Sequence, residues 1–201
     1  MTPPRHLIVT LGCVILLGPW VAAAQPLDTA GATPCEVRGW AQDTDPQGTN
    51  VRSAPRANAP VIGRLAPMVR ITKDETTGTE FDIVAFKDGW LLIRNGSDGG
   101  LKLDAAHEAD GRGWISARLV SVQLRATAFR SAPRPDAAQI AQMSGDNWGP
   151  YSVAVLAVHG CNGPYIEVTA TPVGGKPLRG WSYKPCSLQL TTCDGGIAEP
   201  Q

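Results

Sequence analysis

The sequence carries little charge and no excess of either sign. Of its 201 residues, 18 are basic and 18 are acidic, so the formal net charge is zero. Nucleic-acid binders and proteins that dock on anionic membranes need clustered positive charge, and this balance argues against both classes. Aromatic residues are scarce, at 6%, but hydrophobic residues as a whole reach 43%. That fraction is enough to bury a core, which excludes wholesale disorder.

The composition also argues against long helices. The chain holds 22 glycines and 17 prolines, about a fifth of its residues. These residues interrupt regular structure, so short strands joined by many turns are expected. After the first 24 residues, no stretch shows convincing helical periodicity. The sequence therefore predicts an all-β fold.

The one long hydrophobic run lies at the N-terminus. A short polar start with Arg5 precedes an apolar run over residues 7–21, and three alanines follow at 22–24. This is the order of a secretory signal, and the run is shorter than the roughly 20 residues of a spanning helix. We expect residues 1–24 to be a cleaved signal peptide. The mature chain would have a net charge of −1 and no membrane span, and would be periplasmic or secreted.

Cleavage would leave four cysteines, at Cys35, Cys161, Cys186 and Cys193. An even number in an exported chain predicts two disulfide bonds. The alternative is a metal site with His159 and Cys161 as ligands. No C-x-x-C or H-x-x-x-H pair supports that alternative, so we expect no metal.

The mature chain contains an internal repeat. Residues 49–56 (TNVRSAPR) reappear 78 positions later as residues 127–134 (TAFRSAPR). Each copy is followed by a short apolar stretch, then by a strand, a tight turn and an aromatic-led strand, and ends with Arg-Gly-Trp, at 112–114 and 179–181. Landmarks in the same order indicate a duplication of complete units.

Each unit has the pattern of a small β-barrel, with short strands separated by turn residues. Asp88-Gly89, between two apolar runs, predicts a hairpin, because glycine tolerates the positive φ of the tight turn. The strand at 90–93 is apolar at every position. One face would fill the barrel interior, and the other would pack on a loop or on the sister unit.

These residues resemble the bacterial SH3 (SH3b) domain family. The first unit carries the pattern in residues 50–55, 88–90 and 113–114. The second is divergent, since Phe129 replaces the valine and Tyr165 replaces the first tryptophan. The resemblance implies two tandem SH3-like barrels. The expected limits are a linker at 25–35, domain 1 at 36–122 with an insertion at 95–111, domain 2 at 123–190 and a tail at 191–201.

The resemblance also implies an exported, non-catalytic binding module of the cell envelope. Its partner would be peptidoglycan, a peptide or an envelope protein, with no cofactor. G-x-S-x-G and P-loop motifs and a nucleophile–base pair are missing from the sequence, so we do not expect an enzyme. Two alternatives stay open: an envelope hydrolase activator or hydrolase-associated subunit, and a disulfide-stabilised structural subunit.

Three aromatic residues in or near loops are the candidates for ligand contact: Trp148, Tyr151 and Trp40. The segment Trp148-Gly149-Pro150-Tyr151 would stack on a sugar or grip a peptide, or else pack between the two barrels. Four further aromatics are expected in the core rather than on a binding shelf: Trp90, Trp114, Tyr165 and Trp181. Arg52 and Arg130 are expected to point outward and to anchor backbone or salt bridges rather than bind a carboxylate. His107 is expected to be solvated.

The resemblance also suggests how the cysteines pair. In an SH3-like meander, the strand with Trp181 would return to the rim that holds Cys161, which brings Cys186 within the ~5.5 Å Cα separation that a disulfide needs. We therefore expect Cys161–Cys186 and Cys35–Cys193, with Cys193 as an alternative partner of Cys161.

Overall fold

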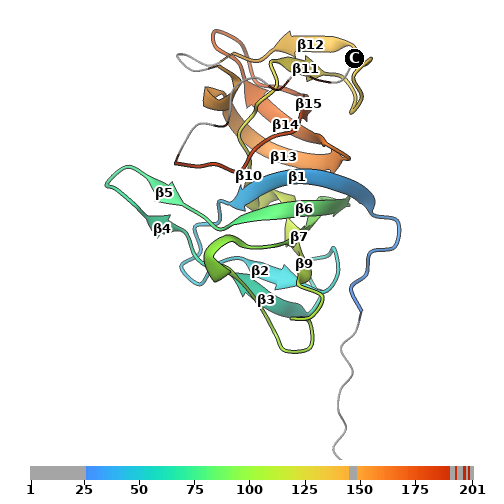
Figure 1. The fold of residues 1–201 in the computed structure, drawn as a ribbon, viewed down its shortest axis with the longest axis vertical. Helices are drawn as coiled ribbons and strands as arrows, with labels where there is room; N and C mark the ends of the chain where they lie inside the picture. The colour runs from blue at the N-terminus through green and yellow to red at the C-terminus, as the bar shows by residue number, and fades with distance from the viewer. Residues whose placement is uncertain (1–25, 145–148, 191–192, 194–196, 198, 200–201) are drawn as a thin grey trace, which may run out of the picture.

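The computed structural model describes residues 26–144, 149–190, 193, 197 and 199, and this part of the chain is almost entirely β (Figure 1). The predicted export signal at 1–24 lies outside the described residues. Within them, the only helical elements are three-residue 3-10 turns: η1 (Ser97–Gly99), η2 (Ala117–Leu119) and η3 (Pro150–Ser152). None of the described helices is long and apolar enough to cross a membrane.

The strands fall into two units. The first contains β1 (Thr33–Ala41), β2 (Asn50–Arg52), β3 (Val61–Leu65), β4 (Val69–Arg70), β5 (Thr76–Thr77), β6 (Glu80–Lys87), β7 (Trp90–Arg94), β8 (Leu101–Leu103), β9 (Arg112–Ser116) and β10 (Val120–Ser121). The second contains β11 (Ala128–Arg130), β12 (Gln139–Gln142), β13 (Ala154–Asn162), β14 (Tyr165–Thr171) and β15 (Leu178–Tyr183).

The two units share one strand order. The first forms an eight-stranded sheet, β10-β1-β6-β7-β9-β2-β3-β8, and the second a five-stranded sheet, β12-β11-β15-β14-β13. Strands β6-β7-β9-β2-β3 therefore correspond in order to β13-β14-β15-β11-β12. This strand order agrees with the duplication predicted from the sequence. Among the described residues, the strands at the two ends of each order do not pair with each other.

The repeat extends to single hydrogen bonds. Arg52 lies opposite the tryptophan of its Arg-Gly-Trp motif, and its Nη1 donates to the carbonyl oxygen of Ala59 at 2.8 Å. Arg130 lies opposite the second such tryptophan and donates in the same way to Ala137, at 2.9 Å. A register shift precedes each arginine. The prediction that both arginines anchor backbone is confirmed.

The predicted hairpin turn is confirmed. Asp88 and Gly89 have φ values of 50° and 82° and join the paired residues Lys87 and Trp90. Two consecutive positive φ angles match the right-handed twist of the flanking strands. The aspartate–glycine pair therefore sets the register between β6 and β7.

The apolar run on β7 buries both of its faces. Leu91 and Ile93 join the main core, whereas Leu92 packs on the opposite face with Trp114 and the N-terminal Leu27. Of the two expected covers for that face, the structure therefore has a loop, the segment just before β1. Trp114 and Tyr165 are buried, at 0% and 4% exposure, which confirms their core assignment. Trp90 and Trp181 are half-buried against smaller clusters.

One core spans both units. Its buried side chains include Ile83 and Val120 from the first unit and Val158 and Ile166 from the second. Strand β1 packs against β13, and the two lie next to each other at the junction of the units (Figure 1). The two units are therefore joined by their hydrophobic core as well as by the chain.

The cysteine pairing predicted from the sequence is wrong. The disulfides are Cys35–Cys161, with Cα atoms 5.7 Å apart, and Cys186–Cys193, with Cα atoms 6.4 Å apart. The prediction treated Cys161 as part of a turn inside an isolated barrel. In the structure Cys161 lies on β13, the strand that faces β1, so its nearest thiol belongs to the other unit.

The insertion at 95–111 lies between β7 and β9, as expected, and adds a strand. Strand β8 pairs with β3 and extends the edge of the sheet. The expectation that His107 is solvated is wrong, because its side chain is only 11% exposed. Its Nδ1 lies 2.6 Å from a carboxylate oxygen of Asp104, and this hydrogen bond lowers the pKa of Asp104.

Candidate functional site

A groove of about 570 Å³ lies beside the β4–β5 hairpin, which projects from the body of the molecule (Figure 1). Four segments of chain line it: the hairpin and its approach, the start of β6, the η1 loop and a stretch that follows the second unit. The lining residues are Ala66, Pro67, Val69, Ile71, Thr77, Gly78, Thr79, Glu80, Ser97, Asp98, Gly100, Leu188, Gln189 and Leu190.

Glycine lets the groove floor approach its neighbours closely. A Cβ on Gly78 would lie 1.8 Å from the carbonyl oxygen of Ala41, at the end of β1. The next residue, Thr79, accepts a hydrogen bond from the Ala41 N–H at 3.0 Å. A Cβ on Gly100 would meet the Thr79 hydroxyl at 2.3 Å. A side chain at Gly78 would collide with backbone, and one at Gly100 would displace the Thr79 side chain, so these two glycines shape the groove.

The chain's own residues 187–190 already occupy one side of this groove. The side-chain oxygen of Gln189 accepts from the Gly78 N–H at 2.7 Å, and its amide nitrogen donates to the Gly78 carbonyl at 2.8 Å. One side-chain amide thus satisfies both backbone groups of a floor residue, as a paired peptide unit would. The floor therefore offers backbone hydrogen-bonding groups that a peptide-like group can bind.

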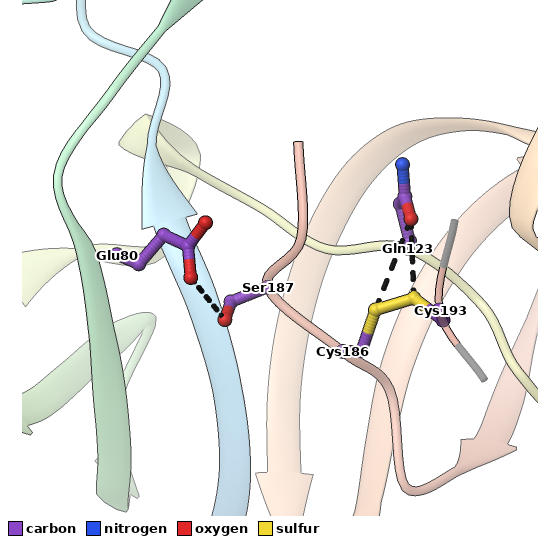
Figure 2. The surroundings of a disulfide bond; sticks show 5 residues. All are labelled: Glu80, Gln123, Cys186, Ser187 and Cys193. Atoms are coloured by element: carbon purple, nitrogen blue, oxygen red, sulfur yellow. Dashed lines mark hydrogen bonds between the residues drawn. A yellow bond between two sulfur atoms is a disulfide. The ribbon is translucent and has the colours of Figure 1, made fainter. Parts of the chain in front are cut away.

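A second contact holds the same segment at Ser187, two residues before Gln189. The Ser187 hydroxyl donates to a carboxylate oxygen of Glu80 at 2.8 Å, and Figure 2 shows the two side chains meeting across the junction of the units. Ser187 is buried, at 1% exposure. The hydrogen bond to an ionised group is of the stronger kind. It ties the end of the second unit to the first.

The Cys186–Cys193 disulfide anchors this segment at its start. The backbone of Cys186 exchanges two hydrogen bonds with Gln123, both 3.0 Å long. The side-chain oxygen of Gln123 lies 3.1 Å from Cys193 Sγ and 3.8 Å from Cys186 Sγ (Figure 2). Because Gln123 follows directly after the first unit, these contacts place the segment on that unit.

The groove is apolar on its walls and acidic in its charge. Val69 and Leu190 are each 56% exposed, Ile71 is 49% exposed and Leu188 is 38% exposed. Half of the eight exposed large hydrophobic side chains among the described residues therefore line one groove. Among the lining residues that the structure describes, only Glu80 and Asp98 are charged, and both are acidic. An apolar ligand that also carries positive charge would match this surface.

Of the predicted contact residues, the two that the structure describes, Tyr151 and Trp40, do not line the groove. Trp148 lies outside the described residues. Tyr151 is half-buried in η3, and Trp40 is half-buried on β1, opposite Glu80 and Ser121. Loop position in the sequence led to these choices. Trp40, however, lies on a strand that pairs with a neighbour on each side, and its side chain is half-buried there.

The sequence did carry a signal for the groove. The stretch 187–190 reads Ser-Leu-Gln-Leu, and the hairpin approach holds Val69 and Ile71 in an otherwise polar stretch. Apolar residues at alternate positions outside the main strands indicate a surface with a partner. That the two stretches meet could not be predicted, because the contact joins residues 111 positions apart.

The two described histidines make hydrogen bonds to different partners in different parts of the fold. The Nε2 of His159 lies 2.8 Å from the Thr169 hydroxyl on the neighbouring strand, and burial lowers the pKa of its imidazole. His107 is held by Asp104 in the insertion. All four cysteines in the described part of the chain are in disulfides. Among the described residues, no three His, Cys, Asp or Glu side chains gather as a metal site would require.

Comparison of the chain with protein-family models, with curated proteins and with solved structures finds no match.

Proposed function

We propose that the chain is an exported, non-catalytic binding module of the cell envelope, built from two SH3b-like barrel units, and that its groove binds an extended peptide. The residues at 50–55, 88–90 and 113–114, which carry the resemblance, support the assignment to SH3b-like units. They fall on β2, on the Asp88-Gly89 turn and on β9, which are neighbouring parts of one sheet. The proposed target is a peptide of peptidoglycan or of an envelope protein.

One observation carries the groove assignment: it already holds a piece of polypeptide. Gln189 bonds to both backbone groups of Gly78, while Leu188 and Leu190 join the apolar wall. Backbone hydrogen bonds with side-chain pockets beside them are the general mode of extended-peptide recognition. A ligand peptide would lie along the remaining open side, against Val69 and Ile71.

The charge of the groove selects the kind of peptide. With Glu80 and Asp98 on its lining and no basic residue there, a peptide with an amine or guanidinium group is favoured. Exposed ion pairs contribute only about 0–1 kcal/mol each, so apolar contact supplies most of the affinity and charge supplies selectivity. We therefore expect weak binding that depends on apolar side chains first.

The non-catalytic assignment is supported by how the reactive side chains are used. The four mature cysteines are bonded in pairs, and a disulfide sulfur is not a nucleophilic thiolate. His159 and His107 make hydrogen bonds to Thr169 and Asp104 rather than to a potential nucleophile.

The test is co-sedimentation of the mature protein with purified sacculi, together with fluorescence anisotropy on labelled peptides that combine apolar and lysine side chains. Val69→Ser should weaken binding about tenfold, because it removes apolar contact from the wall without adding a charge that attracts lysine. Val173→Ser is the matched control, since Val173 is equally a surface valine, at 53% exposure against 56%, and does not line the groove.

The outcomes separate the possible targets. Binding to sacculi that is lost in the Val69 variant supports a peptidoglycan peptide, and binding only to peptides from envelope proteins supports a protein partner. Equal losses in the two valine variants would overturn the groove assignment. Stimulation of an added wall hydrolase without peptide binding would instead favour the activator, and peptide release from sacculi by the protein alone would contradict the non-catalytic assignment.

A further inference from the structure

An arginine of the second unit lies on paired strands beside three aromatic residues. Arg130 on β11 is 16% exposed and lies opposite Trp181 on β15. Tyr165 on β14 lies opposite Tyr183 on β15, and their rings are in tilted contact with centroids 5.2 Å apart. Trp181 and Tyr183 are two residues apart on one strand and so share a face. The strand register therefore places Arg130 on the same face of the sheet as these three aromatic residues.

The chain's own tail reaches this face. Glu199 places one carboxylate oxygen, Oε2, on Arg130, 2.5 Å from Nε and also in contact with Nη2. Its side chain is 7% exposed, and the nearby Ile197 packs on the aromatic cluster. The pKa of the Arg130 guanidinium is raised by the hydrogen bond that it donates to Glu199. Arg52, the equivalent residue of the first unit, makes the same bond to backbone but has no carboxylate partner in the described residues.

Glu199 uses this site incompletely. Its second oxygen, Oε1, is buried and has no hydrogen-bond partner among the described residues. The Tyr165 hydroxyl is also buried, with no partner among the described residues; burial raises its pKa, Glu199 adds to that rise and Arg130 opposes it. An acceptor oxygen and a donor hydroxyl are thus both unpaired near one guanidinium. A buried unpaired polar group costs about 1–3 kcal/mol, so the tail leaves hydrogen-bonding capacity that a differently placed carboxylate would use.

We propose that Arg130, Tyr165, Tyr183 and Trp181 form a carboxylate-binding site for an acidic peptide, and that Glu199 of the chain's own tail occupies it as a competing internal ligand. Arginine recognises carboxylates with both oxygens when the geometry allows two parallel bonds. A free ligand can adopt that geometry, whereas Glu199 places only its Oε2 on the guanidinium. Short tethers give effective concentrations in the millimolar range, so an external peptide must outcompete the tail. This site is separate from the groove and stands whether or not the groove binds a peptide.

The test uses the full mature chain and a blocked synthetic peptide with the sequence of residues 195–201, followed by isothermal calorimetry or NMR titration. Against the wild-type chain this peptide should bind weakly. Glu199→Gln in the protein removes the internal carboxylate and should raise its affinity at least about tenfold. A peptide with glutamine in place of its glutamate should not show this gain.

The two repeat arginines supply a matched control. In the Glu199→Gln background, Arg130→Gln should abolish binding, whereas Arg52→Gln should leave it unchanged although it loses the same type of backbone bond. If Arg130→Gln does not fold, Arg130→Lys keeps the charge but loses the paired N–H groups and should weaken binding. Equal affinity of the wild-type and Glu199→Gln chains, or equal binding of the acidic and glutamine peptides, would overturn the proposal.

Discussion

Cys35 on β1 and Cys161 on β13 join the two repeat units through a disulfide and through the backbone beside it. Glu36 N–H donates to the Gly163 carbonyl, and Gly163 N–H donates to the Pro34 carbonyl, each at 2.8 Å. These bonds form a short parallel bridge at the turn between β13 and β14. The first strand of one unit is thus fastened to the longest hairpin of the other.

The two disulfides should differ in their effect on stability. Cys35–Cys161 closes a loop with a sequence separation of 126, and Cys186–Cys193 one of 7. The chain-entropy relation gives about 5 kcal/mol for the first and about 2 kcal/mol for the second. We expect Cys35→Ala/Cys161→Ala to lose the larger share of the free energy of unfolding in urea titrations. Peptide mapping without reduction checks the pairing, and a larger loss in the Cys186/Cys193 variant would contradict this ranking.

The interface between the units contains a close contact that can be tested. A Cβ on Gly160 would lie 3.1 Å from the ring of Phe86, closer than ordinary van der Waals contact. Gly160→Ala should therefore cost about 1–3 kcal/mol, because the ring must move within a packed core. Phe86→Leu should reduce that cost in a double-mutant cycle. Additive effects of the two substitutions would show that the ring and Gly160 do not interact.

Local features of this fold could be predicted, and contacts between distant segments could not. The Asp88-Gly89 turn, the burial of Trp114 and the repeat all follow from short stretches of sequence that specify their own backbone or periodicity. The arginine bonds to Ala59 and Ala137 recur because six of the eight residues at 49–56 return at 127–134 and start the same loop twice.

The disulfides and the groove depend instead on how the units pack. The position of Cys161 on a strand was hidden because His159 to Pro164 reads as a turn, whereas β13 continues to Asn162 through two register shifts. Such shifts insert residues without a strong sequence signal. The groove likewise needs Gln189 to meet Gly78 from the other unit. Composition and spacing carry no information on that distance.

The two hydrogen bonds between the Gln189 side chain and the Gly78 backbone should be detectable by amide hydrogen exchange. The Gly78 N–H is bonded to the Gln189 side chain at 2.7 Å. Gln189→Ala removes both bonds to Gly78 and should cost about 1–3 kcal/mol, with a matching rise in the exchange rate of the Gly78 amide. Gln42→Ala is the control, since it removes another side-chain bond to backbone, at Val120, and Gln42 does not line the groove. Unchanged Gly78 protection in the Gln189 variant would show that residues 187–190 do not hold the floor.

Stability should depend on pH through His159. Its pKa is lowered from 6.5, first by burial of the ring and then by the charge of Arg179, while Glu167 acts in the opposite direction. The unfolded chain therefore binds a proton at this imidazole more readily than the folded chain does. As the pH falls through 6.5 the unfolded state takes up protons first, so the free energy of unfolding should decrease, and it should level off below the folded pKa.

Urea titrations of the wild-type chain and of His159→Gln, between about pH 5 and pH 8, test this coupling. Glutamine can still bond to the Thr169 hydroxyl but does not titrate, so the slope in this window should flatten. The carboxyl of Asp104 does not interfere, because its pKa is lowered from 3.8 and its contribution is lost only at more acidic pH. His107→Gln controls for the removal of an imidazole and should keep the slope, since His159 is still present. A slope that survives in His159→Gln and disappears in His107→Gln would assign the pH dependence to the insertion rather than to β13.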